Sequence, residues 1–244
     1  MILDLTARVL LMPVLIGQAL YLRANALQLP EPPGARQGEI GKGPLLRLLV
    51  IGDSSAAGVG VPTQDQALLG QVSQRLAQVA TVRYRLVART GAKTGEVLSW
   101  LDDLPEPAYD VVVLAMGVND VTKGVSLRRW LRQKAELIDR FTRDFGARHV
   151  VVSGLPPVHQ FPLLPQPLRW VLGRQAMRFD RHLRALVASR PQCHSVRVNV
   201  DLGTHNMSPD GFHPGPDVYA AWAETICASL MADPALLDPA SDRA

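Results

Sequence analysis

Five strand-like segments alternate with segments of helical periodicity along this chain, and this order limits the possible folds. The strand-like segments cover residues 45–51, 81–88, 110–117, 148–154 and 195–200, and the segment at 81–88 alternates apolar and polar residues. Apolar residues recur at helical spacing between them, and the predicted helices cover 65–80, 94–104, 126–146, 169–190 and 215–232. Parallel neighbours in a sheet need crossover connections, so this alternation predicts an α/β fold with a five-stranded parallel sheet.

The chain divides into three parts by composition. Residues 45–244 have the length and apolar content of one domain with a single substantial core. Residues 29–44 read "LPEPPGARQGEIGKGP", and the density of Pro and Gly predicts a linker. Residues 1–28 form an apolar amino-terminal segment, which needs an interpretation of its own.

Residues 9–22 are apolar except for a few breaks, and as a helix they would reach about 21 Å. That length is short of the roughly 30 Å hydrocarbon core of a bilayer. Three interpretations stay open: a signal peptide cut near Ala26, an uncleaved membrane-seated anchor, and a helix packed on the domain. Asp4 and Arg23 are poorly placed for a signal peptide. We therefore favour membrane association through residues 9–22 without cleavage, with a cytoplasmic or an exported protein as the alternatives.

The charged residues do not predict a nucleic-acid partner. The formal net charge is only +4 at pH 7. Arg174, Arg178 and Arg181 fall on one face of a predicted helix, a stripe that could meet anionic lipid or nucleic acid. Such a stripe is more often the solvated side of an amphipathic helix, which is the interpretation we adopt.

Nucleotide-binding and metal-binding motifs are also missing from the sequence. It contains neither a P-loop nor a G-x-G-x-x-G after a predicted strand, and its six histidines include no H-E-x-x-H. Cys193 and Cys227 have no zinc-ligand spacing, and their pairing stays open. The motifs therefore predict no metal site.

Polar loops follow four of the predicted strands. Asp53 and Ser54 follow the first strand, Asn119 and Asp120 the third, and Pro156 the fourth. The loop "DLGTHNMSPDGFHPG" follows the fifth. Because the carboxyl ends of parallel strands form one edge of a sheet, these loops are expected to converge there on a ligand site.

The converging loops hold the parts of an acyl-transfer site. Ser54, on a strand-to-helix turn, is the candidate nucleophile, and Ser55 is the competing hydroxyl. His213 is the candidate base, with Asp210 one turn earlier to orient its ring. His205 is a weaker candidate, because no acidic residue precedes it by three positions.

Stabilisation of an oxyanion needs hydrogen-bond donors near the nucleophile. Asn119 offers a side-chain amide at the edge of the third strand. The backbone N–H groups of Ser54 and Gly91 can complete the hole, since Gly91 lacks a Cβ and substrate could approach it closely.

These blocks resemble the SGNH (GDSL) hydrolase family. They comprise G-D-S with small residues after it, a Gly block after the second strand, G-x-N-D after the third, and D-x-x-H near the end. The resemblance runs in order from about Leu45 to Ala232. It implies a flavodoxin-like three-layer α/β/α sandwich with no metal or organic cofactor. It also implies Ser54, Asp210 and His213 as a triad, Ser54, Gly91 and Asn119 as oxyanion donors, and Asp53 and Asp120 as supporting residues.

The predicted function is therefore a serine esterase, lipase or acylhydrolase that forms an acyl-serine intermediate on a small ester or an acyl lipid. An O-acetylesterase acting on carbohydrate or cell-envelope material is the alternative within the family. A non-catalytic flavodoxin-like module that binds an anion or acyl group is the alternative from another class. The apolar, Pro-rich loop at 155–168 is expected either to form a substrate wall or to fold back as a satellite cluster.

Overall fold

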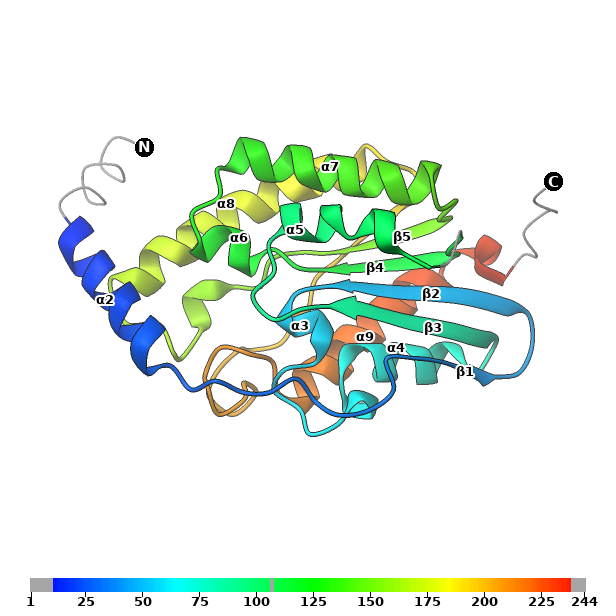
Figure 1. Ribbon diagram of the computed structural model, residues 1–244, viewed down its shortest axis with the longest axis horizontal. Helices are drawn as coiled ribbons and strands as arrows, with labels where there is room; N and C mark the ends of the chain where they lie inside the picture. Colours follow the sequence, from blue (N-terminus) through cyan, green and yellow to red (C-terminus); the bar gives the residue numbers. More distant parts are fainter. Residues whose placement is uncertain (1–10, 106–107, 238–244) are drawn as a thin grey trace.

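A twisted six-stranded sheet lies at the centre of the computed structural model, which describes residues 11–105 and 108–237 (Figure 1). The strands are β1 (Gln37–Gly41), β2 (Leu45–Gly52), β3 (Thr81–Ala88), β4 (Val111–Ala115), β5 (His149–Ser153) and β6 (Cys193–Val196). Their order across the sheet is β1-β3-β2-β4-β5-β6, and β2 to β6 are parallel. The predicted α/β fold is confirmed, because each parallel crossover is made through helical segments.

The predicted count of five strands is wrong, because β1 adds a sixth. It lies within the stretch at 29–44 that the composition predicts to be a linker, and it pairs antiparallel with β3 from Gln37↔Arg85 to Gly41↔Thr81. Its residues, QGEIG, lack the apolar run of a buried strand. An edge strand can form here because backbone hydrogen bonds to β3 hold it regardless of side chain.

Helices cover both faces of the sheet (Figure 1). α5 (Thr94–Ser99), α7 (Leu127–Arg143) and α8 (Leu168–Ala188) lie on one face, and α4 (Leu68–Leu76) and α9 (Pro216–Met231) on the other. Short helices α3 (Ser54–Ala57) and α6 (Val118–Thr122) begin directly after β2 and just after β4. The remaining short turns are η1 (Gln64–Gln66), η2 (Leu101–Asp103), η3 (Val158–Gln160) and η4 (Pro234–Leu237).

The central strands are buried on both faces, as continuous apolar runs predict. Every residue of β4 and β5 is buried. Val112 and Leu114 of β4 pack towards the α7–α8 layer, whereas Val111 and Val113 pack towards the α4–α9 layer. A large-to-small change at such positions costs about 2–5 kcal/mol, so these strands hold the loops at their ends rigidly.

The amino-terminal helix α2 (Met12–Asn25) packs on α8. Leu15 is buried, and Leu11 and Leu22 pack against the same core. The side chain of Gln18 donates to Gln166 O (2.6 Å) and accepts from the backbone N–H of Leu168 (3.2 Å). Of the open interpretations of this segment, a helix packed on the domain matches these contacts. None of the helices in the described part of the chain is long and apolar enough to cross a membrane.

The arginine stripe and the cysteines also have defined positions. Arg174, Arg178 and Arg181 are all exposed on α8, as expected for the solvated side of an amphipathic helix. Cys193 and Cys227 are both free thiols, and Cys227 is buried.

Candidate active site

Ser54 lies at the tight junction between β2 and α3. A Cβ at Gly52 would lie 1.9 Å from Ala115 O, so only glycine allows β2 to approach β4 this closely here. Asp53 is the N-cap of α3, and its Oδ1 accepts the backbone N–H of Ser55 at 3.0 Å. Neither serine therefore serves as the cap, and the Ser54 hydroxyl is free to meet another partner.

That partner is His213, which comes from the far end of the chain. Its Nε2 lies 2.8 Å from Ser54 Oγ, and its Nδ1 lies 2.5 Å from Asp210 Oδ2. Ser54 and Asp210 are buried, and His213 is half-buried. The structure thus brings the three predicted residues into one hydrogen-bonded chain.

Asp210 is held by four donors. Its Oδ1 accepts Ser208 Oγ (2.7 Å) and the backbone N–H groups of Phe212 and His213 (both 2.9 Å). Burial by itself raises the pKa of this carboxyl, but the hydrogen bonds from His213, Phe212 and Ser208 outweigh it and hold the pKa well below its ordinary value. Asp210 is therefore ionised at neutral pH.

Asn119 lies on the first turn of α6, across from Ser54. Its Nδ2 donates to Asp53 Oδ2 at 3.3 Å, which leaves the second hydrogen of the amide for another acceptor. Burial raises the pKa of Asp53, against hydrogen bonds from the backbone N–H groups of Ser55 and Gly117 and the nearby charges of His213 and Lys134. Asp53 thus contacts the Ser54 turn and the Asn119 turn at once.

Gly91 lies on the loop between β3 and α5 with φ of +81°, a conformation that favours glycine. Its carbonyl accepts Lys123 Nζ at 2.6 Å, which ties the β3 loop to the end of α6. Gly91 is not among the residues that line the cavity beside Ser54, whereas Asn119 is.

A buried polar cluster behind these loops was missed from the sequence, apart from Asp120. The carboxylate of Asp120 accepts the backbone N–H of Thr94 (3.2 and 3.1 Å) and Thr94 Oγ1 (2.8 Å). Trp130 Nε1 donates to Thr94 Oγ1 at 3.1 Å, and Lys134 Nζ donates to Met116 O at 3.0 Å. Burial lowers the pKa of Lys134 to about 8, against the raising effect of the charges on Asp120 and Asp53.

The sequence does carry a signal for this cluster. Lys134 lies on the apolar stripe of α7 formed by Trp130, Leu137 and Phe141, spaced as i, i+4, i+7 and i+11. A lysine on a stripe of this kind is fully buried here, and it needs a buried acceptor.

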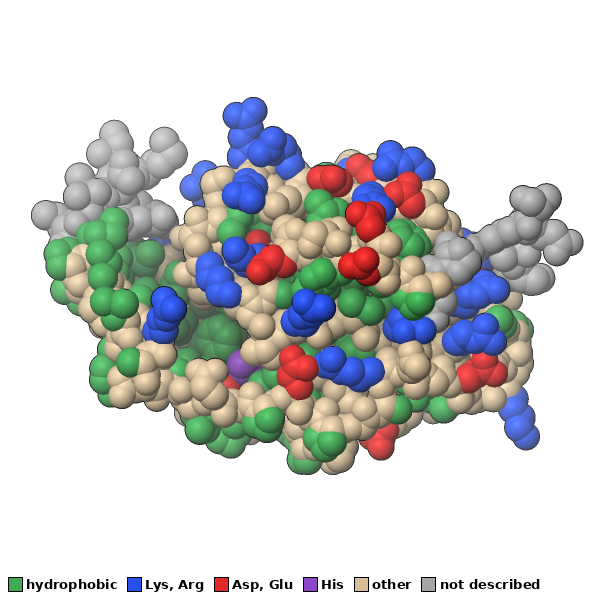
Figure 2. All heavy atoms as spheres, in the orientation of Figure 1, with side chains coloured by type: hydrophobic (Ala, Val, Ile, Leu, Met, Phe, Trp, Pro, Cys, Tyr) green, Lys and Arg blue, Asp and Glu red, His purple; other side chains and the backbone are tan. Residues whose placement is uncertain are grey.

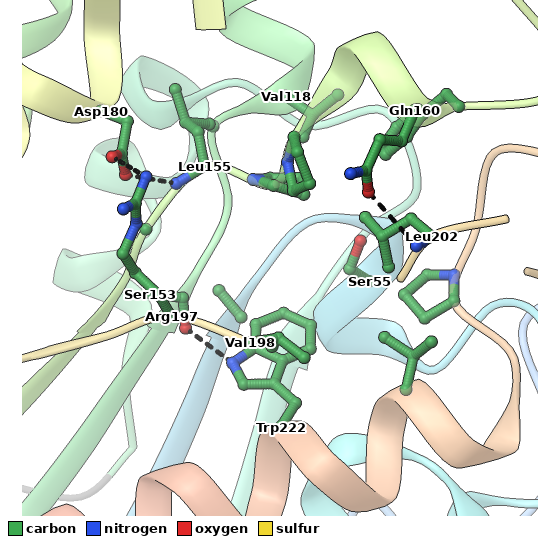
Figure 3. A pocket seen from close by; sticks show the side chains of 18 of the residues that line it. Ser55, Val118, Ser153, Leu155, Gln160, Asp180, Arg197, Val198, Leu202 and Trp222 are labelled. Carbon is green, nitrogen blue, oxygen red and sulfur yellow. Dashed lines mark hydrogen bonds and ion pairs between the residues drawn. The ribbon is translucent and has the colours of Figure 1, made fainter. Parts of the chain in front are cut away.

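A cavity of about 560 Å³ opens beside Ser54. Figure 3 shows side chains from the loops after β4, β5 and β6 and from α9 converging on it. Its wall is mostly apolar and includes Leu155, Phe161, Val198, Leu202 and Trp222. Two polar pairs lie at its margin: Trp222 Nε1 donates to Ser153 Oγ at 3.1 Å, and Arg197 pairs with Asp180 at 2.5 Å.

The loop at 155–168 has both predicted roles, because some of its residues fold back into the core and others line the cavity. Val158, Leu164 and Leu168 are buried in the hydrophobic core, as expected for a loop that folds back. Phe161 is buried and also lines the cavity, together with Leu155. The loop is therefore both a core element and part of the cavity wall.

The competing candidates lie apart from the hydrogen-bonded chain. His205 is 3.8 Å from Asp201, and both side chains are more than 60% exposed to solvent. Ser55 lines the cavity, but its backbone N–H is used by Asp53. His159 is exposed on η3 at the cavity margin.

The family model of the GDSL-like lipase/acylhydrolase family matches residues 50–221, well over half of the chain. The chain belongs to this family. A GDSL-like esterase of Mycobacterium tuberculosis is 26% identical over an alignment 245 residues long. The alignment covers 89% of this chain and 76% of the relative. The predicted resemblance and the enzyme class, a hydrolase of ester bonds, are confirmed at this level.

Two solved structures share the fold. TesA has a TM-score of 0.60 at 24% identity, over 76% of this chain and 98% of TesA. The psychrotrophic esterase EstA from a Pseudoalteromonas species has a TM-score of 0.60 at 17% identity, over 76% of this chain and 97% of EstA. These matches confirm the predicted α/β fold.

Proposed function

We propose that this chain is a serine esterase in which Ser54, His213 and Asp210 act as nucleophile, base and orienting acid. The observation that carries the proposal is the continuous chain of hydrogen bonds from Asp210 through His213 to Ser54 at the wall of an apolar cavity. An anion-binding module would have no use for a histidine and a carboxylate in this arrangement.

The mechanism follows from the tautomer that Asp210 selects. Asp210 accepts a hydrogen bond from His213 Nδ1–H, so the Nε2 lone pair faces Ser54 Oγ. Nε2 takes the hydroxyl proton as Oγ attacks the acyl carbonyl, and the resulting imidazolium gives that proton to the leaving alcohol. Water, deprotonated by the same nitrogen, then attacks the acyl-serine. The bond from the acyl carbon to Oγ breaks, the acid leaves, and Oγ takes the proton back from His213.

The oxyanion is stabilised by donors on three loops. The Ser54 N–H lies in the first turn of α3, where backbone N–H groups have no helical acceptor. Asn119 Nδ2 keeps one hydrogen beyond its bond to Asp53. The family resemblance assigns the third donor to the Gly91 N–H; Gly91 lies outside the lining of the cavity, on a loop that Lys123 holds through the Gly91 carbonyl. Each donor of this kind contributes about 10²–10³ in kcat.

The cavity favours an extended acyl group over an acetyl group. Its volume of about 560 Å³ and its apolar wall exceed what an acetyl group fills. Hydrolysis of p-nitrophenyl esters from acetate to palmitate by the wild type and by Ser54→Ala tests both points. We expect Ser54-dependent turnover that peaks above acetate. A maximum at acetate would favour the O-acetylesterase, and equal rates in both proteins would overturn the proposal.

The exposed side chains of α2 favour the hypothesis that the enzyme binds its substrate at a membrane surface. Met12, Val14, Ile16, Leu20 and Tyr21 are exposed on this face, although Leu15 on the opposite side is buried. A helix that is apolar on all sides and only half covered leaves an unpartnered hydrophobic surface. Figure 2 shows hydrophobic side chains gathered over α2, with a hollow floored by hydrophobic side chains beside it.

The charge beside this face suits an anionic lipid surface. Arg23 is exposed at the end of α2, and the exposed face of α8 interleaves Trp170 and Met177 with Arg174 and Arg181. Tryptophan and arginine around an apolar helix are typical of interfacial binding.

Sedimentation with vesicles tests the lipid surface. The wild type is expected to sediment with phosphatidylglycerol vesicles more than with phosphatidylcholine vesicles, and Ile16→Glu with Leu20→Glu is expected to abolish sedimentation. Val79→Glu is the control, because Val79 is also exposed but does not belong to α2. Equal sedimentation of all three proteins would contradict this part of the proposal.

A further inference from the structure

Two histidines and an aspartate meet at the edge of the sheet opposite the candidate active site. His149 is the first residue of β5, His194 the second residue of β6, and Asp233 follows α9. Ser54 follows the carboxyl end of β2, whereas these histidines lie near the amino ends of their strands. Because β2, β5 and β6 are parallel, the two groups lie at opposite edges.

The sheet register places both histidines on the α9 face. His194 pairs with Val151 of β5, and Val151 and His149 lie two residues apart on one face of that strand. His149 Nδ1 is 3.1 Å from His194 Nε2 and 3.6 Å from Asp233 Oδ2. All three potential ligand atoms lie within 4.8 Å of one another.

Two of these separations, 3.1 and 3.6 Å, are close to the edge of a zinc coordination tetrahedron. Ligand atoms held about 2.0–2.1 Å from zinc at tetrahedral angles lie roughly 3.3–3.4 Å from each other. Two imidazole nitrogens and one carboxylate oxygen are also a donor set that zinc accepts. We propose that His149, His194 and Asp233 form a binding site for a divalent transition metal, Zn²⁺ in the first place.

Neighbouring groups orient two of the three ligands, Asp233 and His194. Asp233 Oδ1 accepts the backbone N–H of Ala235 at 3.0 Å, so Oδ2 is the oxygen that faces His149. His194 Nδ1 lies 3.3 Å from Ser229 Oγ, which leaves Nε2 directed to the cluster. Outer partners of this kind fix the ring and tautomer of a ligating histidine.

The carboxylate of Asp233 and its exposure to solvent suit a cation. Arg148 is near His149, but its Nε lies 4.0 Å from Asp110, and its two terminal nitrogens bind Ala235 O and Leu236 O. Asp110 is shared with Arg47, whose Nη1 lies 3.7 Å from it, so Asp233 is the carboxylate that faces the histidines. His149 is only 3% exposed, whereas the Asp233 side chain is 38% exposed, so water can occupy a fourth position.

The position of the site indicates a structural role. Its ligands come from β5, β6 and the end of α9, so a bound metal would cross-link three elements of the α9 side of the domain. α9 begins three residues after His213, but the metal itself lies at the other edge of the sheet. We therefore expect the metal to stabilise the fold and to leave ester hydrolysis nearly unchanged.

Calorimetric titration of the chelator-treated protein with Zn²⁺, and visible absorption with Co²⁺, test the site. The wild type is expected to bind one equivalent, to show a four-coordinate cobalt spectrum, and to melt at a higher temperature with Zn²⁺. His194→Ala and Asp233→Asn should lose all three effects while still melting cooperatively in chelator. His205→Ala, which removes an exposed histidine beside Asp201, is the matched control and should bind as the wild type does.

Two results would overturn the proposal. One is the same zinc stoichiometry and cobalt spectrum in the wild type and in His194→Ala, which would place the metal elsewhere on the chain. The other is a folded wild type that takes up no Zn²⁺ at concentrations far above those of the protein. Ester hydrolysis by Ser54 is independent of either result, so this test does not depend on the proposed function.

Discussion

The two halves of the candidate site are built in different ways. The nucleophile half lies after the ends of β2 and β4 and on α7. It comprises Asp53, Ser54, Asn119, Asp120 and Lys134, and its charged groups are buried. The base half, residues 207–214, is a loop whose only strand-like pairing is the bridge Met207↔Pro214. In the nucleophile half, the buried charge of Lys134 offsets those of Asp120 and Asp53. In the base half, the Asp210 carboxylate is held by four hydrogen-bond donors.

The two buried aspartates show the consequence of this difference. Asp53 has its pKa raised by burial, and Asp210 has its pKa lowered by hydrogen bonds that outweigh burial. The first arrangement suits a group that links loops, and the second suits a group that must stay ionised beside an imidazole. We therefore expect changes in the base half to affect the chemical step, and changes in the charged network of the nucleophile half to affect stability as well.

The largest expected effect is on the reacting pair. Ser54→Ala, His213→Ala and the double variant are each expected to lower kcat by about 10⁴–10⁶, and the two losses should not add, because the pair acts as one unit. Single-turnover rates on a p-nitrophenyl ester measure this, with Ser55→Ala as the control. Additive losses would mean that the two residues act separately.

The next effect is on the stability of the nucleophile half. Lys134→Met leaves the charges of Asp120 and Asp53 buried without their cation, which typically costs about 3–5 kcal/mol of unfolding free energy. Urea denaturation measures this loss. The double variant Lys134→Met with Asp120→Asn should recover part of it, and a double variant less stable than the single one would contradict the compensation.

Removal of the oxyanion donor should affect rate without affecting the fold. Asn119→Ala is expected to lower kcat by about 10²–10³ at nearly constant KM, because the lost hydrogen bond forms mainly in the transition state. Steady-state kinetics measure this loss. A loss below about fivefold would remove Asn119 from the oxyanion hole, since one donor is worth far more.

The two aspartates should give opposite dependences of stability on pH. An unfolded Asp titrates near pH 3.9. Because the pKa of Asp210 is lowered in the folded state, this group stabilises the fold above about pH 3.9, and the stabilisation is lost as the pH falls. Because the pKa of Asp53 is raised in the folded state, this group stabilises the fold below about pH 3.9, and the stabilisation is lost as the pH rises.

Urea denaturation at a series of pH values compares Asp210→Asn and Asp53→Asn with the wild type. On acidification, the difference in unfolding free energy between the wild type and Asp210→Asn should shrink. The difference in unfolding free energy between the wild type and Asp53→Asn should grow. Parallel curves for the two variants would show that the two halves do not differ electrostatically.

The smallest expected effect concerns the cavity wall. Val198→Phe places a larger ring in the cavity and should lower kcat/KM for long acyl esters relative to butyrate by about tenfold. Val79→Phe, at an exposed position, is the control. An unchanged chain-length profile would show that the acyl chain lies elsewhere.

The sequence predicts the parts of the fold that rest on side-chain pattern. The apolar runs locate β2, β4 and β5 to within two residues at either end, because strands buried on both faces require them. The alternation of apolar and polar residues locates β3, which is only partly buried. The sequence does not predict β1, whose QGEIG residues pair through the backbone alone. β6 is also misplaced, at Cys193–Val196 instead of 195–200, since Arg197 and Asn199 continue an alternating pattern after the pairing has ended.

The same distinction applies to the sites. Ser54, Asn119, Asp210 and His213 stand in short local motifs, so their convergence can be predicted from the order of the strands. His149, His194 and Asp233 are separated by about forty residues each, and only the register of β5 and β6 and the end of α9 bring them together. No spacing rule for metal ligands covers such a set, which is why the motifs predicted no metal site.

Covalent labelling with an alkyl fluorophosphonate identifies the nucleophile without the need for a substrate. Ser54 Oγ would displace fluoride from phosphorus and pass its proton to His213, leaving one adduct per chain that tandem mass spectrometry places on Ser54. We expect this adduct in the wild type and in Ser55→Ala, and none in Ser54→Ala. An adduct on Ser55, or undiminished labelling of Ser54→Ala, would contradict the assignment of Ser54 as the nucleophile.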